Sequence, residues 1–315
     1  MVKYPMLLTP AFKDYIWGGT RLREDYGKKC GLDKIAESWE LSCHPDGVCV
    51  IENGEYAGMT LAEYVMRFPE ALGSDCARFD RFPVLIKLID AHDRLSVQVH
   101  PDNEYALAHE NEYGKTEMWY IADCEDGAEL LYGFTHEITR EEFCQRIAEN
   151  TLLETVKSVP VHKGDVFFIG AGTLHAIGKG IVIAEIQQNS NTTYRIYDYG
   201  RKGSDGKPRP LHTDKAAEVT RLEPAPAQKI YPEENGVRKL AECEYFTVSR
   251  VAVSDKAELF ASDASFTHIL TLEGCAELTR GDSPLTLSKG TGVFIPAGSG
   301  KLEITGCCEL ITTTV

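Results

Sequence analysis

A polar pair at the end of a short β-strand is the first candidate for binding a metal ion. Residues alternate along the segment Leu95–His100, so Gln98 and His100 face one side of the strand while the valines between them face the other. A Pro-Asp pair ends the strand at once and fixes the imidazole at its tip. A solvent-facing polar pair is the common alternative, so partners elsewhere in the chain decide between the two.

A lysine and a glutamate repeat this period at the start of a second predicted strand. Lys115 and Glu117 share one face of the sequence Gly-Lys-Thr-Glu that leads into the apolar strand MWYIADC. A Lys-x-Glu pair on a strand is commonly a surface ion pair, and that alternative stays open. As a partner of His100, Glu117 adds a carboxylate to the candidate set.

A second imidazole, His175, follows a glycine-rich turn in the sequence Ala-Gly-Thr-Leu-His-Ala, whose apolar residues argue against a solvated histidine. Gln98, His100, Glu117 and His175 together offer two nitrogen and two oxygen donors. Such a set suits Zn²⁺ or another borderline divalent ion with one position open to water or substrate. The combination is far more specific than any of its members.

An arginine, Arg195, interrupts an otherwise apolar and aromatic strand. It could be a structural partner of Asp198 or Glu185, but a guanidinium near a metal also suits an anionic or polyhydroxy substrate. Ser96 faces the same side as Gln98 and is a candidate hydrogen-bond donor to phosphate, although a serine in a strand is usually structural.

Short strands must position these residues, because most of the first 220 residues consist of β-branched, aromatic or alternating runs between Gly, Pro and Asp turns. The pattern predicts a mostly β protein, a sandwich or double-sheet roll with a few peripheral helices. The expected strands are Val84–Asp90, Leu95–His100, Glu117–Asp123, Glu129–Gly133, Val166–Gly170, Ile181–Gln187 and Thr193–Tyr197, and the expected helices are Asp102–Glu110, Thr139–Glu149 and Thr213–Thr220.

The composition is that of an ordinary globular protein of 315 residues, enough for about two domains. Its formal charge, 33 − 48 = −15, repels phosphate backbones and anionic lipids, so neither nucleic acid nor a membrane is expected as a partner. The first ten residues contain two prolines and are too short an apolar stretch for a signal peptide or a membrane span. An anionic metabolite would therefore need a local concentration of cations.

Ten cysteines occur without any C-x-x-C spacing, which predicts reduced, mostly buried thiols and a cytoplasmic location. Thiolate metal ligands are the alternative, but the cysteines lack the clustered spacing of such sites.

A proline-rich, charged stretch at 223–236 breaks the strand pattern and marks a linker. We therefore expect a metal-binding domain at 1–235 and a second β domain at 236–315. The strands expected in the second domain are Tyr245–Val253, Phe266–Glu273, Ala276–Arg280, Gly292–Pro296 and Lys301–Thr305.

One internal sequence repeat connects the two domains. Lys163–His175 reads KGDVFFIGAGTLH and Lys289–Lys301 reads KGTGVFIPAGSGK, with equal length and no gap. Each copy is expected to form a turn, a buried strand and a glycine turn that delivers the last residue. Because that residue is His175 in one copy and Lys301 in the other, the second domain is expected to lack metal ligands. Chance recurrence of such a segment is the alternative.

These motifs, in this order, resemble the type I mannose-6-phosphate isomerases, metal-dependent enzymes of the cupin superfamily. The resemblance covers most of residues 7 to 220 and rests on the motifs LSVQVHP (95–101), GKTE (114–117), AGTLHA (171–176) and NTTYRIYD (191–198), with YIWGG (15–19) and ESWE (37–40) nearer the start. It implies tandem cupin-type β-rolls, jelly-roll double sheets of which the second has no ligands. It also implies one Zn²⁺ or another divalent ion per chain on Gln98, His100, Glu117 and His175, with Arg195 as the active-site arginine.

The resemblance further implies reversible isomerisation of mannose 6-phosphate and fructose 6-phosphate through an enediol(ate), with the metal as Lewis acid. Arg195 would stabilise charge on the enediolate or bind phosphate, and Lys115 would handle a proton or contact phosphate. The expected partner is a phosphorylated hexose, and nothing in the sequence indicates an obligate protein partner. Trp17 and Trp119 are candidates for lining the pocket, with the core as the alternative.

Two departures place the chain with a short bacterial subgroup. It has Gly-Lys-Thr-Glu where longer relatives have His-Lys-Pro-Glu, and it is too short for their helical insertion. How the phosphate is held therefore stays open. A non-catalytic sugar-binding cupin and a cupin enzyme with other metal chemistry, such as an oxygenase or epimerase, are the competing interpretations, and the complete ligand set favours the isomerase.

Overall fold

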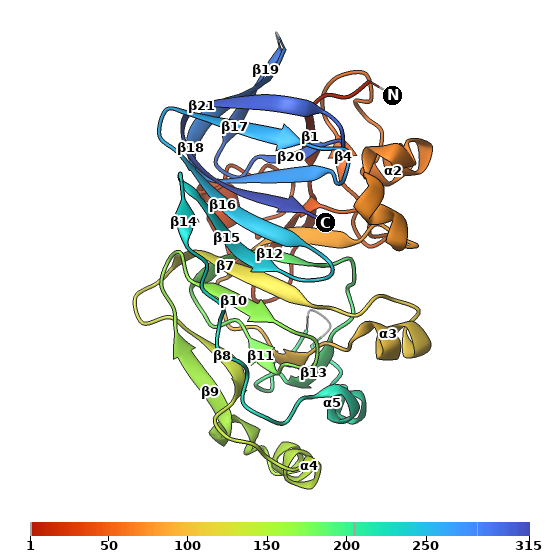
Figure 1. Ribbon diagram of the computed structural model, residues 1–315. Helices are drawn as coiled ribbons and strands as arrows, with labels where there is room; N and C mark the ends of the chain where they lie inside the picture. The colour runs from red at the N-terminus through yellow and green to blue at the C-terminus, as the bar shows by residue number, and fades with distance from the viewer. Residues whose placement is uncertain (1, 204–205, 282) are drawn as a thin grey trace.

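The computed structural model describes residues 2–203, 206–281 and 283–315. Two β-rich halves stack along the long axis of the molecule, and short helices lie at its periphery (Figure 1). The expectation of a mostly β protein with a few outer helices is confirmed. No helix among the described residues is long and apolar enough to cross a membrane.

The first half consists of two antiparallel sheets that face one another. The six-stranded sheet has the order β10-β7-β12-β5-β3-β2, and the five-stranded sheet the order β13-β6-β11-β8-β9. The strands of the larger sheet are β2 (Ala11–Lys13), β3 (Glu37–Leu41), β5 (Val84–Ala91), β7 (Glu117–Cys124), β10 (Val166–Ile169) and β12 (Ile181–Gln188). Those of the smaller sheet are β6 (Val97–Val99), β8 (Glu129–Phe134), β9 (Val156–Pro160), β11 (His175–Ala176) and β13 (Tyr194–Tyr197).

Burial on both faces explains the continuous apolar runs of the larger sheet, because strands covered on both sides cannot alternate with solvent-facing residues. All eight residues of β5 and all eight of β12 are buried. The inner face contributes Ile89, Trp119 and Ile183 to a core between the two sheets. The outer face contributes Leu88 and Ala184 to a larger core shared with the second half.

The second half is one ten-stranded sheet with the path β14-β15-β16-β21-β18-β20-β1-β4, to which β17 and β19 are added on β21 and β18. Its strands are β1 (Met6–Thr9), β4 (Val50–Ile51), β14 (Glu233–Glu234), β15 (Val237–Glu242), β16 (Thr247–Val253), β17 (Lys256–Ala261), β18 (Thr267–Arg280), β19 (Ser283–Ser288), β20 (Gly292–Ile295) and β21 (Gly300–Thr314). Because β1 pairs with β20, residues from the start of the chain complete the sheet formed by its end.

Two expectations for the second half were wrong in extent. The segments Phe266–Glu273 and Ala276–Arg280 were expected as separate strands but form the single strand β18. Gly274 adopts φ 76° beside a β-bulge, so the chain bends without losing its pairing with β21. The last expected strand, Lys301–Thr305, continues to Thr314 because β21 pairs along its length with β16, β17 and β18.

Side-chain caps explain where several helices begin. Asp102 caps α3 (Asn103–His109) and Thr139 caps α4 (Arg140–Ala148) by accepting a hydrogen bond from a backbone N–H. These two helices and α5 (Thr213–Val219) were expected from the sequence. The helix α2 was not expected, although Thr60 and Glu63 form a capping box at its start. The remaining helical elements are α1 (Arg21–Glu24), α2 (Leu61–Arg67) and the 3₁₀ turns η1 (Pro69–Ala71), η2 (Ser74–Arg78) and η3 (Leu152–Glu154).

Candidate metal centre

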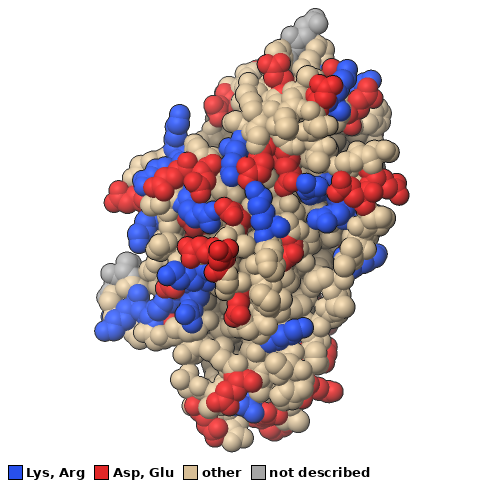
Figure 2. Space-filling model, turned by 90° about the vertical axis from the view of Figure 1, so that its left-hand side faces the viewer, with Lys and Arg blue, Asp and Glu red and all other residues tan. Residues whose placement is uncertain are grey.

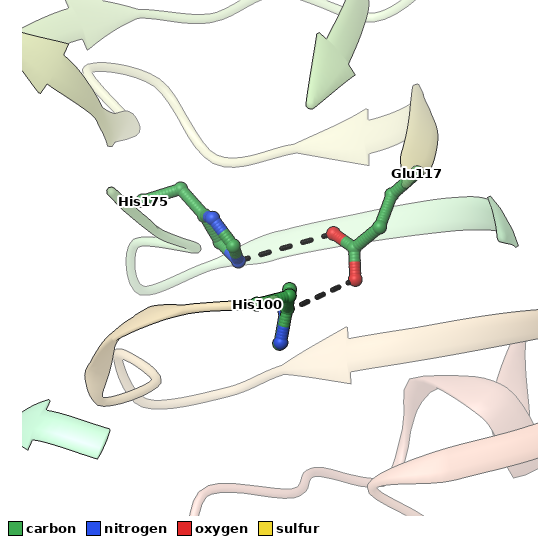
Figure 3. Close-up of side chains that lie close together, drawn as sticks. All are labelled: His100, Glu117 and His175. Atoms are coloured by element: carbon green, nitrogen blue, oxygen red, sulfur yellow. Dashed lines mark ion pairs between the residues drawn. The ribbon is translucent and has the colours of Figure 1, made fainter. Parts of the chain in front are cut away.

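Two imidazoles and one carboxylate converge between the two sheets of the first half (Figure 3). His100 directly follows β6, His175 begins β11, and Glu117 begins β7 on the opposite sheet. One ligand atom from each of the three lies within 4.8 Å of the others, and all three side chains are at least 99% buried. Segments far apart in the sequence thus meet at a single point.

The unused ring nitrogen of each histidine is held by a backbone carbonyl. His100 Nδ1 lies 2.9 Å from the Thr192 carbonyl oxygen, and His175 Nδ1 lies 2.8 Å from that of Thr173. A carbonyl only accepts hydrogen bonds, so each Nδ1 carries the proton and each Nε2 offers its lone pair to the centre. Burial, with the Lys115 cation, lowers the pKa of His100 to about 3, and burial lowers that of His175. Both rings are therefore neutral near pH 7.

Both oxygens of the buried Glu117 carboxylate are surrounded by nitrogens. Lys115 Nζ lies 2.5 Å from Oε1, His100 Nε2 lies 3.2 Å from Oε1, and His175 Nε2 lies 3.9 Å from Oε2. Burial alone would raise the pKa of Glu117, but its interactions with these neighbours, led by the Lys115 cation, outweigh burial and hold the pKa well below its usual range. The glutamate is thus a buried anion, which fits a cation between it and the two imidazoles.

The amide of Gln98 completes the donor set predicted from the sequence. Its side-chain nitrogen, as placed, lies 3.4 Å from His175 Nε2, and a flip of the amide would bring the oxygen to that position. Gln98 Cα pairs with His175 on one side and with Arg195 on the other. Arg195, Gln98 and His175 therefore form a row across β13, β6 and β11. This donor set of two imidazoles, a carboxylate and an amide suits a borderline divalent ion.

A cavity of about 290 Å³ borders the centre through Gln98 and Lys115, which contact His175 and His100. Four of the residues predicted for the site, Ser96, Gln98, Lys115 and Arg195, line it, as does Trp17. Trp119, the other candidate, does not line the cavity: its ring packs against that of His175 at 5.2 Å and its Nε1 donates to Glu185. For Trp119 the core alternative therefore holds, because the side chain lies in the core between the sheets.

Two alternatives from the sequence are also resolved by the packing. Lys115 and Glu117 form an ion pair, but it is buried, with side-chain exposures of 5% and 0%. Arg195 is not a partner of Asp198 or Glu185 among the described residues, because its Nε donates to Ser96 and its Nη1 to the Pro210 carbonyl. Arg195 is thus oriented by neutral acceptors.

A second buried charge cluster in the cavity wall was not predicted. Lys87 Nζ lies 3.1 Å from a Glu185 oxygen and 3.7 Å from a Glu37 oxygen. Burial and the Glu117 charge raise the pKa of Glu185, and the two glutamates raise that of Lys87 despite its burial. The available signal was one charged residue, Lys87 or Glu185, on the face that points between the sheets in each of two mainly apolar strands, VLIKLIDA and IVIAEIQQ.

Acidic and basic side chains are interspersed over the face shown in Figure 2. With an overall charge of −15, this mixed surface offers an anionic ligand little attraction from a distance. Attraction has to come from the cavity, whose lining includes Arg195 and Arg209.

Two families match separate parts of the chain. Residues 6–144 match the catalytic domain of phosphomannose isomerase type I, and residues 237–315 match the cupin domain of mannose-6-phosphate isomerase. The chain is 40% identical over 318 residues to the mannose-6-phosphate isomerase ManA of Bacillus subtilis, with 99% of both chains covered. It is 38% identical to a mannose-6-phosphate isomerase of Streptococcus mutans, with 98% of both covered.

Solved structures agree with these matches. The crystal structure of the mannose 6-phosphate isomerase from Bacillus subtilis superposes with a TM-score of 0.92 at 36% identity, covering 99% of each chain. The apo form of the mannose 6-phosphate isomerase from Salmonella typhimurium superposes with a TM-score of 0.80 at 18% identity, also over 99% of each chain, and shares the fold.

Proposed function

Because the chain belongs to the type I mannose-6-phosphate isomerase family, we propose that it interconverts D-mannose 6-phosphate and D-fructose 6-phosphate by proton transfer between C1 and C2 through an enediol(ate). The observation that carries the proposal is the convergence of His100, Glu117 and His175 beside a cavity whose lining includes Lys115, Arg195 and Arg209. The reaction links mannose to glycolysis and to mannose-derived nucleotide sugars.

The donor set fits a metal, and Zn²⁺ is the ion that we propose. His100, His175, Glu117 and Gln98 would hold one ion per chain, which matches the preference of zinc for imidazole and carboxylate ligands with a position left open. When bound, the ion supplies Lewis acidity to the substrate oxygens at C1 and C2. The backbone carbonyls of Thr192 and Thr173 orient the two imidazoles toward it.

Proton transfer between two carbons needs a group that accepts and returns a proton. Lys115 keeps the assignment made from the sequence, because it lines the cavity and contacts both His100 Nε2 (3.3 Å) and Glu117. Glu185 is a second candidate carrier, since it lines the cavity and its raised pKa makes the carboxylate a stronger base than an exposed one. Lys87 would balance its charge.

Arg195 and Ser96 act on the substrate from the other sheet. The guanidinium would stabilise negative charge on the enediolate or on phosphate, and the Ser96 hydroxyl, 3.3 Å from Arg195 Nε, would hold that guanidinium and donate to the same anion. Arg195→Ala is expected to lower the rate by about 10²-fold or more.

The cytoplasm is the compartment that we propose. All ten cysteines carry free thiols, including the exposed Cys144, Cys275 and Cys307, and free exposed thiols suit a reducing compartment.

A coupled assay for fructose 6-phosphate formed from mannose 6-phosphate tests the proposal. The purified protein is assayed as isolated, after chelation and after zinc is restored. We expect activity to be lost with the metal and recovered with zinc. Zinc-loaded protein that converts no mannose 6-phosphate would contradict the proposal and favour a non-catalytic sugar-binding protein with the same ligand set.

A further inference from the structure

The charges around the cavity are unevenly distributed between its two walls. On the wall formed by the six-stranded sheet, Lys87 faces two glutamates, Glu37 and Glu185, so this group carries a net charge of 1 − 2 = −1. Lys115 and Glu117 neutralise one another. The cations that remain in the cavity lining, Arg195 and Arg209, lie on the opposite wall.

Arg195 has no carboxylate partner among the residues that the structure describes. Its Nε and Nη1 donate to the neutral oxygens of Ser96 and Pro210, and no such acceptor meets its Nη2 in the described part of the chain. Burial and the nearby Arg209 cation lower the pKa of Arg195, although Asp198 opposes this. The local field is therefore positive and uncompensated, which favours an anion beside the guanidinium.

Arg209 shares the Asp198 carboxylate with a third arginine, Arg201. Its Nε lies 2.8 Å from Asp198 Oδ2 and its Nη2 lies 2.6 Å from Oδ1, while Arg201 Nη2 also lies 2.6 Å from Oδ1. Arg201 also pairs with Asp93, so the arginines Arg195, Arg201 and Arg209 set against the carboxylates of Asp93 and Asp198 leave this wall a net charge of 3 − 2 = +1. Within the described residues, Arg209 Nη1 meets no acceptor.

Arg201 differs from Arg209 in where it points. It donates to the Arg94 carbonyl and lies 3.7 Å from Asp93, and it does not line the cavity. The same carboxylate therefore holds one arginine facing the cavity and one facing away. The two side chains are similarly buried, with 18% and 16% exposure.

We propose that Arg209, held in place by Asp198, binds the phosphate of the substrate together with Arg195. The inference rests on the proposed function for the identity of the sugar, and it assigns the phosphate to the loop that follows β13. The net positive charge of this wall attracts a phosphate dianion, and the net negative charge of the Lys87 group on the opposite wall disfavours it there. Arg209 Nη1 and Arg195 Nη2, which meet no acceptor among the described residues, supply donors suited to phosphate oxygens.

The position of this wall also orients the substrate. Arg195, Gln98 and His175 are neighbours on successive strands, so the arginine and the histidine are two strand spacings, about 10 Å, apart. A hexose 6-phosphate carries its phosphate at the end of the carbon chain opposite C1. Phosphate at the arginine wall thus directs C1 and C2 toward the donor set on the floor of the cavity.

The variants Arg209→Gln and Arg201→Gln form a matched pair, because each removes one arginine from Asp198 and leaves the other. Two quantities are measured on the zinc-loaded proteins: binding of inorganic phosphate by calorimetry, and kcat and KM for mannose 6-phosphate. For Arg209→Gln we expect the phosphate Kd and the KM to rise about 10- to 100-fold, because a charge-assisted hydrogen bond to phosphate is lost. The kcat should change less than about 3-fold. For Arg201→Gln we expect less than about a 3-fold change in each.

A phosphate Kd unchanged in Arg209→Gln would overturn the inference, as would equal effects of the two variants, which would indicate a role through Asp198 alone. Arg209→Lys keeps the positive charge but loses the planar guanidinium with its paired N–H donors. An intermediate phosphate Kd is expected for this variant, which keeps the inference testable even if Arg209→Gln folds poorly. Because phosphate binding is measured without turnover, a protein that binds phosphate through Arg209 but isomerises nothing would refute the proposed function and leave this inference standing.

Discussion

The two halves contain the same backbone unit and use it differently. In Lys163–His175 and Lys289–Lys301 the strands β10 and β20 occupy matching positions, and in both copies the glycines before and after the strand have positive φ (92° and 85°, 86° and 69°). The first copy ends on His175, which is completely buried. The second ends on Lys301, which is 61% exposed and paired with Glu258. The backbone positions a residue, and the residue type decides what the position does.

The interiors of the two halves also differ in the chemistry of their side chains. Between the sheets of the first half lie buried charged residues, including Lys87, Glu117 and Glu185. One core of the second half is almost entirely aliphatic, with Leu278, Val293 and similar side chains. An aliphatic interior adds stability but no chemistry, so we infer that the second half serves to cover the outer face of the six-stranded sheet, with which it shares a core.

The largest effect is expected from substituting His175, the residue at the end of the first copy. His175→Ala should remove bound zinc and lower the isomerase rate by at least about 10³-fold, because the Lewis acid contributes several kcal/mol to catalysis. Lys301→Ala, the same change at the matching position, should alter the rate less than about 2-fold. Metal analysis and the coupled assay measure both. Full zinc occupancy in His175→Ala would remove this histidine from the ligand set.

Truncating the shared core should destabilise both halves at once. Phe294 on β20 is fully buried against Phe266 (5.3 Å between rings) and Tyr64 (6.2 Å), so Phe294→Ala is expected to cost about 3–5 kcal/mol. All three tryptophans lie in the first 119 residues, so tryptophan fluorescence reports on the first half alone. We expect its urea midpoint to fall together with that from circular dichroism. A fluorescence midpoint that stays at the wild-type value would show that the halves unfold independently.

Acid sensitivity should also arise in the second half. Burial, with the nearby Lys28, lowers the pKa of His268 to about 3 from 6.5. The folded protein therefore keeps this ring neutral while the unfolded chain takes up a proton below pH 6.5. Its contribution to stability is complete above pH 6.5 and is lost as the pH falls toward 3, by about 1.4 kcal/mol per pH unit.

Chemical denaturation of wild type and His268→Asn between pH 7 and 4 measures this contribution. The free energy of unfolding of His268→Asn should fall less steeply with falling pH than that of the wild type. The difference in slope should correspond to the uptake of about one proton fewer on unfolding. The exposed His136→Asn serves as the control and should follow the wild-type slope. Parallel slopes for wild type and His268→Asn would contradict the assignment.

Local patterns explain which features could be predicted from the sequence. The donor set could be predicted because Gln98 and His100 alternate within one strand, and His175 follows a recognisable turn. Lys87 and Glu185 could not be assigned, because each is an isolated charge on one face of a mainly apolar strand, and only the pairing of β5 with β12, which sets Glu185 opposite Lys87, makes them partners.

Long-range pairing accounts for most of what the sequence did not reveal. Nothing near Met6–Thr9 indicates that β1 joins β20, almost 290 residues later in the chain. Arg209 follows a run of turn residues and no periodic pattern marks it. It enters the cavity wall because Asp198, at the end of β13, holds it there. The division at 235/236 remains a prediction from composition.

The smallest effects are expected from substituting the glycines that lie three residues before His175 and Lys301. Gly172 (φ 85°) and Gly298 (φ 69°) both occupy the left-handed region, so alanine at either should cost about 1–2 kcal/mol. Gly172 N–H donates to the His100 carbonyl and its turn leads to His175, so Gly172→Ala disturbs two candidate ligands and should weaken zinc binding about 10-fold. Gly298 N–H donates to Ser262, remote from the centre, so Gly298→Ala should match the loss of stability with no change in zinc affinity. Chelator competition measures that affinity, and an equal loss in both variants would mean that the turn affects zinc through global stability and not through the residue it delivers.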